Sequence, residues 1–344
     1  MSKAVPQSGL LEMSLDSGRF DPSGSKGVLD YLSVRRPDAF FRSLVLLTAK
    51  KGISAAQLSQ IIAGVKKIER PLRGTPQNLV DVCGTGGDGL SSFNISSVSA
   101  FVVAGAGGCV AKHGNRAVTS RCGSSDLMEA LGVKLDAPQA AMIKALHRAG
   151  IGYFHGPFYH PALARVQALR RALGVRTFFN DAGPLLNPCR LKAQLIGVSG
   201  ADQMDFYEEL LVKRGIRRAL ILRSFDGFDE ATTSAPSAVA EIVNGRRRRW
   251  TLVPGKYGFK RSSAAAYKGG SVAVNRRIAL GILEGRIRGP RCDVVLLNAG
   301  LALYIAGRAA RIEDGIAQGR AALDSGAARD ALAKLVKISN SNDS

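Results

Sequence analysis

The sequence lacks the features that mark several common protein classes. No stretch approaches the ~18 consecutive apolar residues of a membrane-spanning helix. The first twenty residues contain neither a basic n-region nor an apolar h-region, so we expect no signal peptide and a cytoplasmic protein. The five cysteines are widely spaced, odd in number and without a C-x-x-C pair, which argues against a disulfide framework and a structural zinc site.

Acidic residues are also few. The chain has 27 Asp and Glu against 48 Lys and Arg, a formal net charge of +21. Such a balance suits nucleic acid, an anionic membrane surface or a polyanionic small substrate, and composition does not choose among them. At 344 residues and 46% apolar, the chain is long enough for about two domains with a sizeable core.

The first 78 residues have the apolar spacing of helices. Apolar side chains recur there at intervals of three and four, at Leu29, Leu32, Phe40, Phe41, Leu44, Leu47, Leu58, Ile61 and Ile62. Pro71 and Pro76 then end the pattern. The stretch His160–Gly174 again indicates a helix, which we expect to join the N-terminal helices.

After Pro76, short β-branched runs alternate with helical stretches. The expected strands are Leu79–Val82, Cys109–Ala111, Ile151–Phe154, Leu195–Val198, Ala219–Leu222, Ile242–Val243 and Val294–Leu297. Helices are expected at Ala201–Lys213 and Ser271–Leu283. This alternation predicts an α/β fold with a mostly parallel sheet, whose ligands bind at the carboxyl ends of the strands.

A glycine-rich loop follows the first of these strands. Gly84, Gly86, Gly87 and Gly89 lack Cβ atoms, so backbone N–H groups can approach an anion closely. The polar residues that precede the next helix, which would complete an anion site at its N-terminus, are Asn94, Ser96 and Ser97.

A nicotinamide-cofactor loop is an alternative because the glycines also fit G-x-G-x-x-G. However, the helix does not open on the last glycine, and Lys112-His113 stands where an acidic residue would be expected. A capped glycine turn without a ligand also remains open.

Two further loops carry charge at the same predicted sheet edge. In the segment 112–120, with Ser124 after it, cationic and neutral donors suit phosphate oxygens, although a solvated basic loop would look similar. In the segment 224–230, the adjacent carboxylates Asp229 and Glu230 are natural Mg²⁺ ligands, although a surface turn is the simpler alternative. Together the three loops predict a site for a Mg²⁺-bound, multiply phosphorylated substrate.

These residues resemble anthranilate phosphoribosyltransferase. The shared motifs, in order, are Gly-Thr-Gly-Gly-Asp at 84–88, Asn-Ile-Ser-Ser at 94–97, Lys-His-Gly-Asn-Arg at 112–116, Tyr-His-Pro-Ala at 159–162, Leu-Arg-Arg-Ala-Leu-Gly at 169–174, Phe-Asn at 179–180, Gly-Pro-Leu-Leu-Asn-Pro at 183–188, Asp-Gly-Phe-Asp-Glu at 226–230 and Asn-Ala at 298–299. The resemblance runs from about Leu79 to Lys337. It implies a helical domain at 1–78, completed by about 160–190 and used for dimerisation, and an α/β catalytic domain at 79–159 and 191–344.

The resemblance also assigns site residues. Those implied for phosphoribosyl pyrophosphate are Gly84, Gly87, Asp88, Ser92, Asn94, Ile95, Ser96, Ser97, Lys112, His113, Gly114, Asn115, Arg116, Ala117, Val118, Thr119, Ser120 and Ser124. Those implied for anthranilate are Gly84, His113, Asn115, His160 and Arg170. Those implied for two Mg²⁺ ions are Ser96, Asp229 and Glu230. An aromatic amine already carries a lone pair, so we expect positioning by Lys112, His113, Asn115 and Arg170 rather than a strong acid or base.

Some features depart from the family. The first ~45 residues match poorly, which leaves the mode of dimerisation open. Asp181 stands where an apolar residue is usual, next to the expected acceptor pocket, as does His155 before Gly156, and either could alter the accepted aromatic acid. The run Arg246–Arg249 is expected to be a solvated edge.

Two other functions remain as alternatives. A pyrimidine nucleoside phosphorylase would share the fold and a related glycine loop, but it does not need the pair Asp229 and Glu230. A relative that binds nucleic acid and has lost catalysis would suit the +21 charge, but not an intact substrate set.

Overall fold

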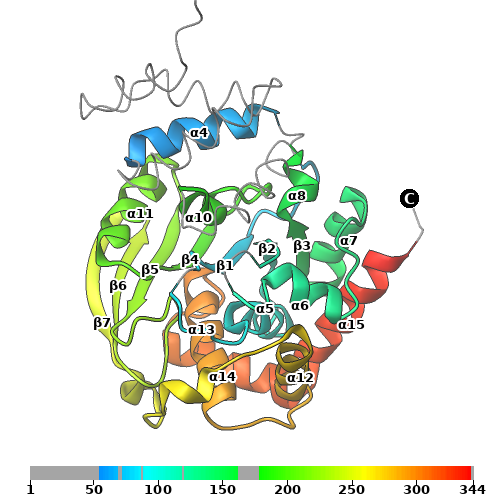
Figure 1. The fold of residues 1–344 in the computed structure, drawn as a ribbon, viewed down its shortest axis with the longest axis vertical. Coiled ribbons are helices and arrows are strands. Elements are labelled where there is room, and N and C mark those ends of the chain that lie inside the picture. The colour runs from blue at the N-terminus through cyan, green and yellow to red at the C-terminus, as the bar shows by residue number, and fades with distance from the viewer. Residues whose placement is uncertain (1–53, 69–71, 87, 118–119, 162–177, 342–344) are drawn as a thin grey trace, which may run out of the picture.

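A seven-stranded sheet runs through the middle of the computed structural model, which describes residues 54–68, 72–86, 88–117, 120–161 and 178–341 (Figure 1). The strand order is β3-β2-β1-β4-β5-β6-β7. The strands are β1 (Val80–Gly84), β2 (Val110–Gly114), β3 (Ile151–His155), β4 (Ala193–Gly197), β5 (Arg218–Ser224), β6 (Ser237–Val243) and β7 (Arg246–Leu252). The five strands from β3 to β5 are parallel, and β6 and β7 add antiparallel to one edge. The predicted mostly parallel α/β fold is confirmed.

Helices cover both faces of the sheet (Figure 1). The α-helices are α4 (Ala55–Ile68), α5 (Ile95–Gly105), α6 (Ser124–Ala130), α7 (Gln139–Ala149), α8 (Gly156–Tyr159), α10 (Phe178–Ala182), α11 (Ala201–Lys213), α12 (Val272–Leu283), α13 (Pro290–Ile305), α14 (Ile312–Asp324) and α15 (Ala327–Asn340). Short 3₁₀ turns are η1 (Gly183–Leu185), η2 (Pro254–Tyr257) and η3 (Ala264–Tyr267). The predicted helix Ala201–Lys213 is confirmed, and Ser271 caps α12 by accepting a hydrogen bond from the Val274 N–H.

The side chains of the central strands divide the core in two. Leu195 of β4 and Leu220 of β5 face one apolar cluster, which includes α5, α13 and α14. Ile196 and Ile221, one residue further along each strand, face the other cluster, formed with α4, α10 and α11. Successive side chains of a strand point to opposite faces, so strands that are apolar at every position become buried on both sides.

One predicted strand is wrong. Val294–Leu297 lies inside the helix α13, which begins with Pro290 at its first turn. Nearly every residue of α13 is buried, so its sequence lacks the alternating polar face that identifies a surface helix. A short, uniformly apolar run has the same pattern in a buried helix and in a buried strand.

The N-terminal helical prediction is testable only in part. Helix α4 is present, and Leu58, Ile61 and Ile62 form its buried face, as their spacing predicts. That face packs in the apolar cluster with α11. The other predicted helical positions before residue 54, and the stretch from 162 to 174, lie outside the described residues.

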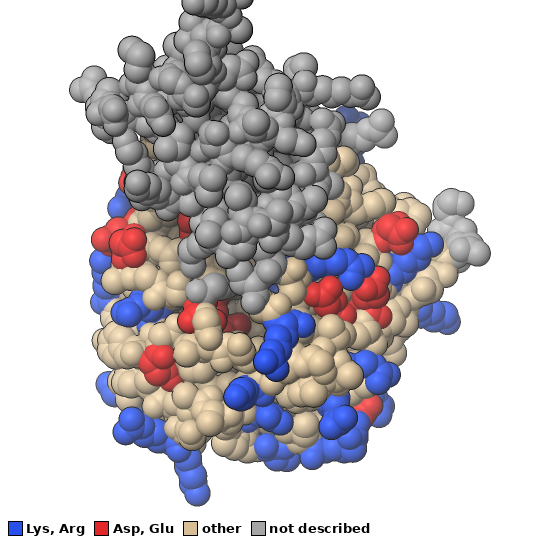
Figure 2. Space-filling model, viewed as in Figure 1, with Lys and Arg blue, Asp and Glu red and all other residues tan. Residues whose placement is uncertain are grey.

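The arginine run forms the edge strand β7. Three of its guanidinium groups pair with carboxylates: Arg247 and Arg249 with Glu208 of α11, and Arg248 with Glu241 of β6. A charged edge strand resists pairing with another sheet. Figure 2 shows the Lys and Arg side chains of one face in separate groups rather than in one stripe. Within the described ranges, no helix combines the length and apolarity needed to cross a bilayer.

Candidate active site

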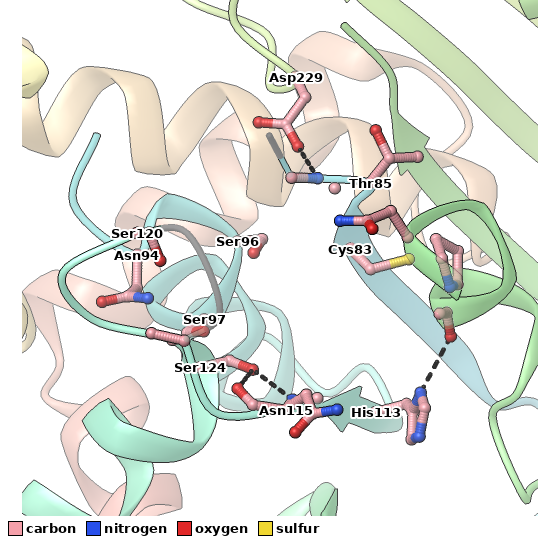
Figure 3. Close-up of a pocket in the computed structure, with 18 of the residues that line it drawn as sticks. Cys83, Thr85, Asn94, Ser96, Ser97, His113, Asn115, Ser120, Ser124 and Asp229 are labelled. Carbon is pink, nitrogen blue, oxygen red and sulfur yellow. Dashed lines mark hydrogen bonds between the residues drawn. The ribbon is translucent and has the colours of Figure 1, made fainter. Parts of the chain in front are cut away.

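A cavity of about 530 Å³ opens at the carboxyl edge of the parallel strands. The three loops singled out in the sequence meet there: the glycine loop after β1, the segment after β2, and the carboxylate pair after β5. In Figure 3, Asp229 lies at one end of the site and Asn115 and His113 at the other. Neighbouring parallel strands deliver their C-terminal loops to the same edge, which explains why loops far apart in sequence converge.

The start of α5 forms one wall of the cavity. Asn94 is the N-cap residue of this helix, and Ser96 and Ser97 lie in its first turn. Asn94 Oδ1 and Ser97 Oγ are buried and have no hydrogen-bond partner among the described residues. Buried polar atoms without a partner are costly unless a ligand satisfies them. The Ser97 hydroxyl can donate to an anion, whereas Asn94 Oδ1 can only accept, so this wall is suited to a ligand that carries both donors and acceptors.

Asp229 packs directly against two glycines of adjacent strands. Gly84 of β1 and Gly197 of β4 are paired in the sheet register. A Cβ atom on Gly197 would lie 1.4 Å from the Asp229 carbonyl oxygen, and one on Gly84 would lie 2.2 Å from Asp229 Oδ2. Asp229 Oδ2 also accepts a 2.6 Å hydrogen bond from the Gly86 N–H. The position of this carboxylate therefore depends on the absence of side chains beneath it.

Three carboxylates meet at this end of the cavity. Asp88, Asp229 and Glu230 each offer an oxygen within 4.8 Å of the others. Burial, and next the charge of Asp88, raises the pKa of Asp229 to about 6, while burial and the charge of Asp229 raise the pKa of Glu230 well above its usual range. Glu230 Oε2 and Asp88 Oδ2 are buried without a partner among the described residues. Crowded, unneutralised carboxylate oxygens fit a divalent cation such as Mg²⁺.

The loop that carries this pair is fixed from α13. Asn298 Nδ2 donates to the carbonyl oxygen of Ala231 at 2.7 Å, and Asn298 Oδ1 accepts from the Ala231 N–H at 3.2 Å. Because Ala231 follows Glu230 directly, the buried amide holds the loop from behind. Asn298 belongs to the Asn-Ala motif, to which the sequence alone assigned no position.

Lys112 enters the cavity wall from β2 as a buried cation. Its side chain is 2% exposed, and Nζ donates to the Val82 carbonyl oxygen at 2.8 Å. Burial lowers the pKa of Lys112, and the nearby Asp81 opposes that shift. Burial in turn raises the pKa of Asp81 to about 6, and Lys112 and Asn187 oppose that rise. The positive charge thus lies within the site rather than on a solvated loop.

Two histidines stack edge to face in the opposite half of the cavity. The rings of His113 and His160 have centroids 5.4 Å apart. His113 Nδ1 lies 3.1 Å from the Gly183 carbonyl oxygen, so Nδ1 donates and Nε2 is left as an acceptor. Burial, and next the charge of His160, lowers the pKa of His113 to about 3. His113 is therefore neutral near pH 7 and a weak base.

The structure brings most of the proposed site residues together. Those that line the cavity are Gly84, Asp88, Ser92, Asn94, Ser96, Ser97, Lys112, His113, Gly114, Asn115, Arg116, Ala117, Ser120, Ser124, His160, Asp229 and Glu230. The side chain of Ile95 is buried in the core instead, so only its backbone could reach a ligand. Gly87, Val118, Thr119 and Arg170 lie outside the described residues.

The cavity has further lining residues that the sequence did not assign to it. They are Asp81, Cys83, Thr85, Gly86, Gly89, Ser91, Phe93, Cys122, Gly123, Gly156, Pro157, Asn180, Gly183, Pro184 and Leu186. Six of these belong to motifs shared with the family, and that membership was the signal available in the sequence: Thr85, Gly86, Asn180, Gly183, Pro184 and Leu186. The cysteines and Phe93 carried none.

Two expected neighbours of the acceptor pocket do not line the cavity. His155 turns to α6, where Nδ1 lies 2.8 Å from Ser125 Oγ. Asp181 turns to α11, where it accepts a 2.7 Å hydrogen bond from Gln203 Nε2. An effect of these two residues on the accepted aromatic acid stays a prediction. Each stands next to a lining residue in sequence, but its own side chain points to a neighbouring helix.

Comparison with known proteins first places the chain in a class. Residues 76–329 match the glycosyl transferase family, a/b domain. The chain is 43% identical over 302 residues to an anthranilate phosphoribosyltransferase of Thermomicrobium roseum, covering 87% of this chain and 86% of that protein. The chain therefore belongs to the anthranilate phosphoribosyltransferase family.

Solved structures agree with this assignment. The crystal structure of anthranilate phosphoribosyltransferase from Thermus thermophilus superimposes with a TM-score of 0.84 at 34% identity, covering 92% of this chain and 95% of that one. The Saccharomyces cerevisiae enzyme in complex with PRPP and Mg superimposes with a TM-score of 0.82 at 23% identity, over 91% of this chain and 90% of that one. The yeast enzyme therefore shares the fold of this chain at low sequence identity.

Proposed function

We propose that this chain transfers the phosphoribosyl group of phosphoribosyl pyrophosphate to the amine of anthranilate, a step of tryptophan biosynthesis. The products are N-(5-phosphoribosyl)anthranilate and pyrophosphate. The observation that carries the proposal is that one cavity joins a carboxylate cluster, the start of helix α5 and a histidine-lined half. Family membership supports the same reaction.

The phosphoribosyl half of the site comprises the glycine loop, the start of α5 and the segment after β2. In it, backbone N–H groups and the Ser97 hydroxyl would donate to the phosphates, and Asn94 lies beside them in the same cavity wall. The buried charge of Lys112 would act there with little solvent screening. Gly87, Val118 and Thr119 keep their proposed roles from the family motif.

Magnesium would be held by Asp229 and Glu230, with Ser96 contacting a second ion. The raised pKa values and the unpaired Glu230 oxygen support a cation at the pair. Bound Mg²⁺ would supply positive charge for the leaving pyrophosphate. Two ions remain the proposed number.

Anthranilate would occupy the half of the cavity near His113, Asn115 and His160, with its carboxylate on Arg170. Gly84, which lies beneath Asp229, keeps its proposed role from the family motif. A neutral His113 with Nε2 as an acceptor can orient the amine without taking its proton in the ground state. The amine lone pair attacks the anomeric carbon as the bond to pyrophosphate breaks. Catalysis then depends on orientation and on charge stabilisation of the leaving group.

The proposal extends to domains and assembly. Contact between α4 and α10 supports a helical domain at 1–78 completed by about 160–190, which packs through α4 on α11 of the α/β domain at 79–159 and 191–344. We further propose a cytoplasmic homodimer through the helical domain, with no membrane partner and only weak, steeply salt-dependent affinity for nucleic acid.

The test is the loss of anthranilate fluorescence on mixing purified protein with phosphoribosyl pyrophosphate, with and without Mg²⁺. We expect anthranilate consumption only when both are present, and one pyrophosphate released per anthranilate. Phosphate-dependent cleavage of a pyrimidine nucleoside without anthranilate consumption would overturn the proposal.

A further inference from the structure

Arg116 borders the cavity, but its guanidinium group is held by two carboxylates of α6. Its NH1 group donates to Asp126 Oδ1 at 3.1 Å and to Glu129 Oε2 at 2.7 Å, and its NH2 group donates to Glu129 Oε1 at 2.8 Å. Neither Asp126 nor Glu129 lines the cavity. A two-pronged pair of this kind fixes the plane of the guanidinium as well as its position.

Asp126 also binds the backbone on either side of the same segment. Its Oδ2 accepts from the Ala117 N–H at 3.0 Å and from the Gly123 N–H at 2.9 Å. Burial raises the pKa of Asp126, but these N–H groups and Arg116 outweigh it and lower the pKa overall. Asp126 therefore stays ionised and keeps accepting all three hydrogen bonds near neutral pH.

The turn at 115–117 lies directly against the start of α6. A Cβ atom on Gly123 would lie 2.3 Å from the Ala117 nitrogen and 2.7 Å from the Asn115 carbonyl oxygen. The Ser125 N–H donates to that carbonyl oxygen at 3.1 Å, and Ser124 Oγ accepts from the Asn115 N–H at 3.2 Å (Figure 3). The backbone of this turn, which carries Asn115 at the cavity wall, is thus set by α6.

We propose that Asp126 and Glu129 are positioning residues for the substrate site, because through Arg116 and Ala117 they fix the turn that presents Asn115 to the cavity. An isolated surface ion pair would contribute little. Here, however, Arg116 follows the cavity-lining residue Asn115 directly, so a change in the position of Arg116 would also move Asn115 relative to the ligand. The proposal rests on the proposed function and deepens it.

The test is a double-mutant cycle on turnover with phosphoribosyl pyrophosphate and anthranilate. Glu129→Gln keeps the shape of the side chain and removes its charge. We expect it to raise the KM for phosphoribosyl pyrophosphate by roughly two- to fivefold, the range of an exposed ion pair, with kcat and Tm nearly unchanged. In an Arg116→Gln background, the same change should have no further effect, because the pair is already broken.

A matched control is Asp324→Asn, which removes the charge from a remote ion pair of similar exposure. Arg288 NH1 lies 2.8 Å from Asp324 Oδ1, with both side chains about half exposed. We expect this variant to keep the wild-type KM and kcat. A second variant, Asp126→Asn, should raise the KM by about tenfold or more, because Asp126 accepts from two backbone N–H groups as well as Arg116.

An unchanged KM in Glu129→Gln would overturn the positioning role, even if Asp126→Asn fails to fold. So would an equal effect of Glu129→Gln in the presence and absence of Arg116. If the wild-type protein consumes no anthranilate, the proposed function fails instead. Wild-type turnover with an unaltered Glu129→Gln variant overturns only the inference drawn from α6.

Discussion

Replacing Gly197 by alanine should displace the carboxylate pair without touching a substrate-binding side chain. The new Cβ would begin 1.4 Å from the Asp229 carbonyl oxygen, whereas real contacts are at least 3.0 Å. Backbone must therefore move by about 1.6 Å, since the obstructing atom belongs to the main chain of Asp229 and not to a flexible side chain. Gly197 is also paired within the sheet to Gly84 and Leu222, so the strand itself cannot easily retreat.

The expected costs differ between stability and catalysis. Overpacking of a core position typically costs about 1–3 kcal/mol of the free energy of unfolding. A misplacement of ~1 Å in catalytic machinery costs on the order of 100-fold in rate. We therefore expect Gly197→Ala to remain folded but to lose about 100-fold or more in kcat/KM, with a raised Mg²⁺ requirement.

The assay combines thermal unfolding, anthranilate consumption and a Mg²⁺ titration. Gly255→Ala in η2 is the matched control, because a Cβ atom there would meet no heavy atom within 4 Å. Gly84→Ala is an intermediate case, because its closest clash would be with the Asp229 carboxylate, which can rotate. Gly84→Ala should lose activity with a smaller effect on Tm than Gly197→Ala. If Gly197→Ala does not fold, the activity of Gly84→Ala tests whether the position of Asp229 depends on the glycines beneath it. Wild-type kcat/KM and Mg²⁺ affinity in Gly197→Ala would refute the reasoning.

Three further outcomes are expected. Asp229→Asn combined with Glu230→Gln should abolish turnover yet raise the Tm of the metal-free protein at pH 7.5; retained turnover would contradict the metal assignment. Burial raises the pKa of Asp229 from 3.8 to about 6, so the metal-free fold loses stability as the pH rises through that range. Mg²⁺ should therefore raise Tm more at pH 7.5 than at pH 5, which calorimetry can measure. Arg170→Ala should raise the KM for anthranilate by about tenfold and leave the KM for phosphoribosyl pyrophosphate unchanged, because a charge-assisted contact contributes roughly 1.5–3 kcal/mol; an equal rise in both steady-state constants would contradict the division of the site.

Much of the site was predictable because its signals are local. The glycine loop, the basic segment and the carboxylate pair each follow a strand whose apolar run is visible in the sequence. Parallel topology then brings strand ends to one edge, so three local signals combine into one site. Prediction from local patterns fails where a helix and a strand have the same apolar pattern. Helix α13 is buried on all sides, so its run Val294–Leu297 cannot be distinguished from a buried strand in the sequence.

Other features depend on contacts that no local pattern encodes. Strand β7 begins with four arginines, which are poor strand signals, and it is held by β6 and by carboxylates of α11. His155 precedes and Asp181 follows a cavity-lining residue in sequence, but their side chains form hydrogen bonds with Ser125 and Gln203 from other elements. Their directions became visible only once those helices were placed.

Gly197 shows what the geometry adds to the motifs at the proposed metal site. Asp229 and Glu230 were identified by their charge and by their place in a shared motif. Their position, however, is produced by a glycine on another strand that belongs to no recognised motif, and by Asn298 from a helix that the sequence pattern misassigned. A carboxylate pair that binds a cation must be held close together against its own repulsion. The residues that hold the pair in place are therefore as necessary for metal binding as the carboxylates are. Substitutions at Gly197 or Asn298 should lower metal affinity more than they lower the free energy of unfolding.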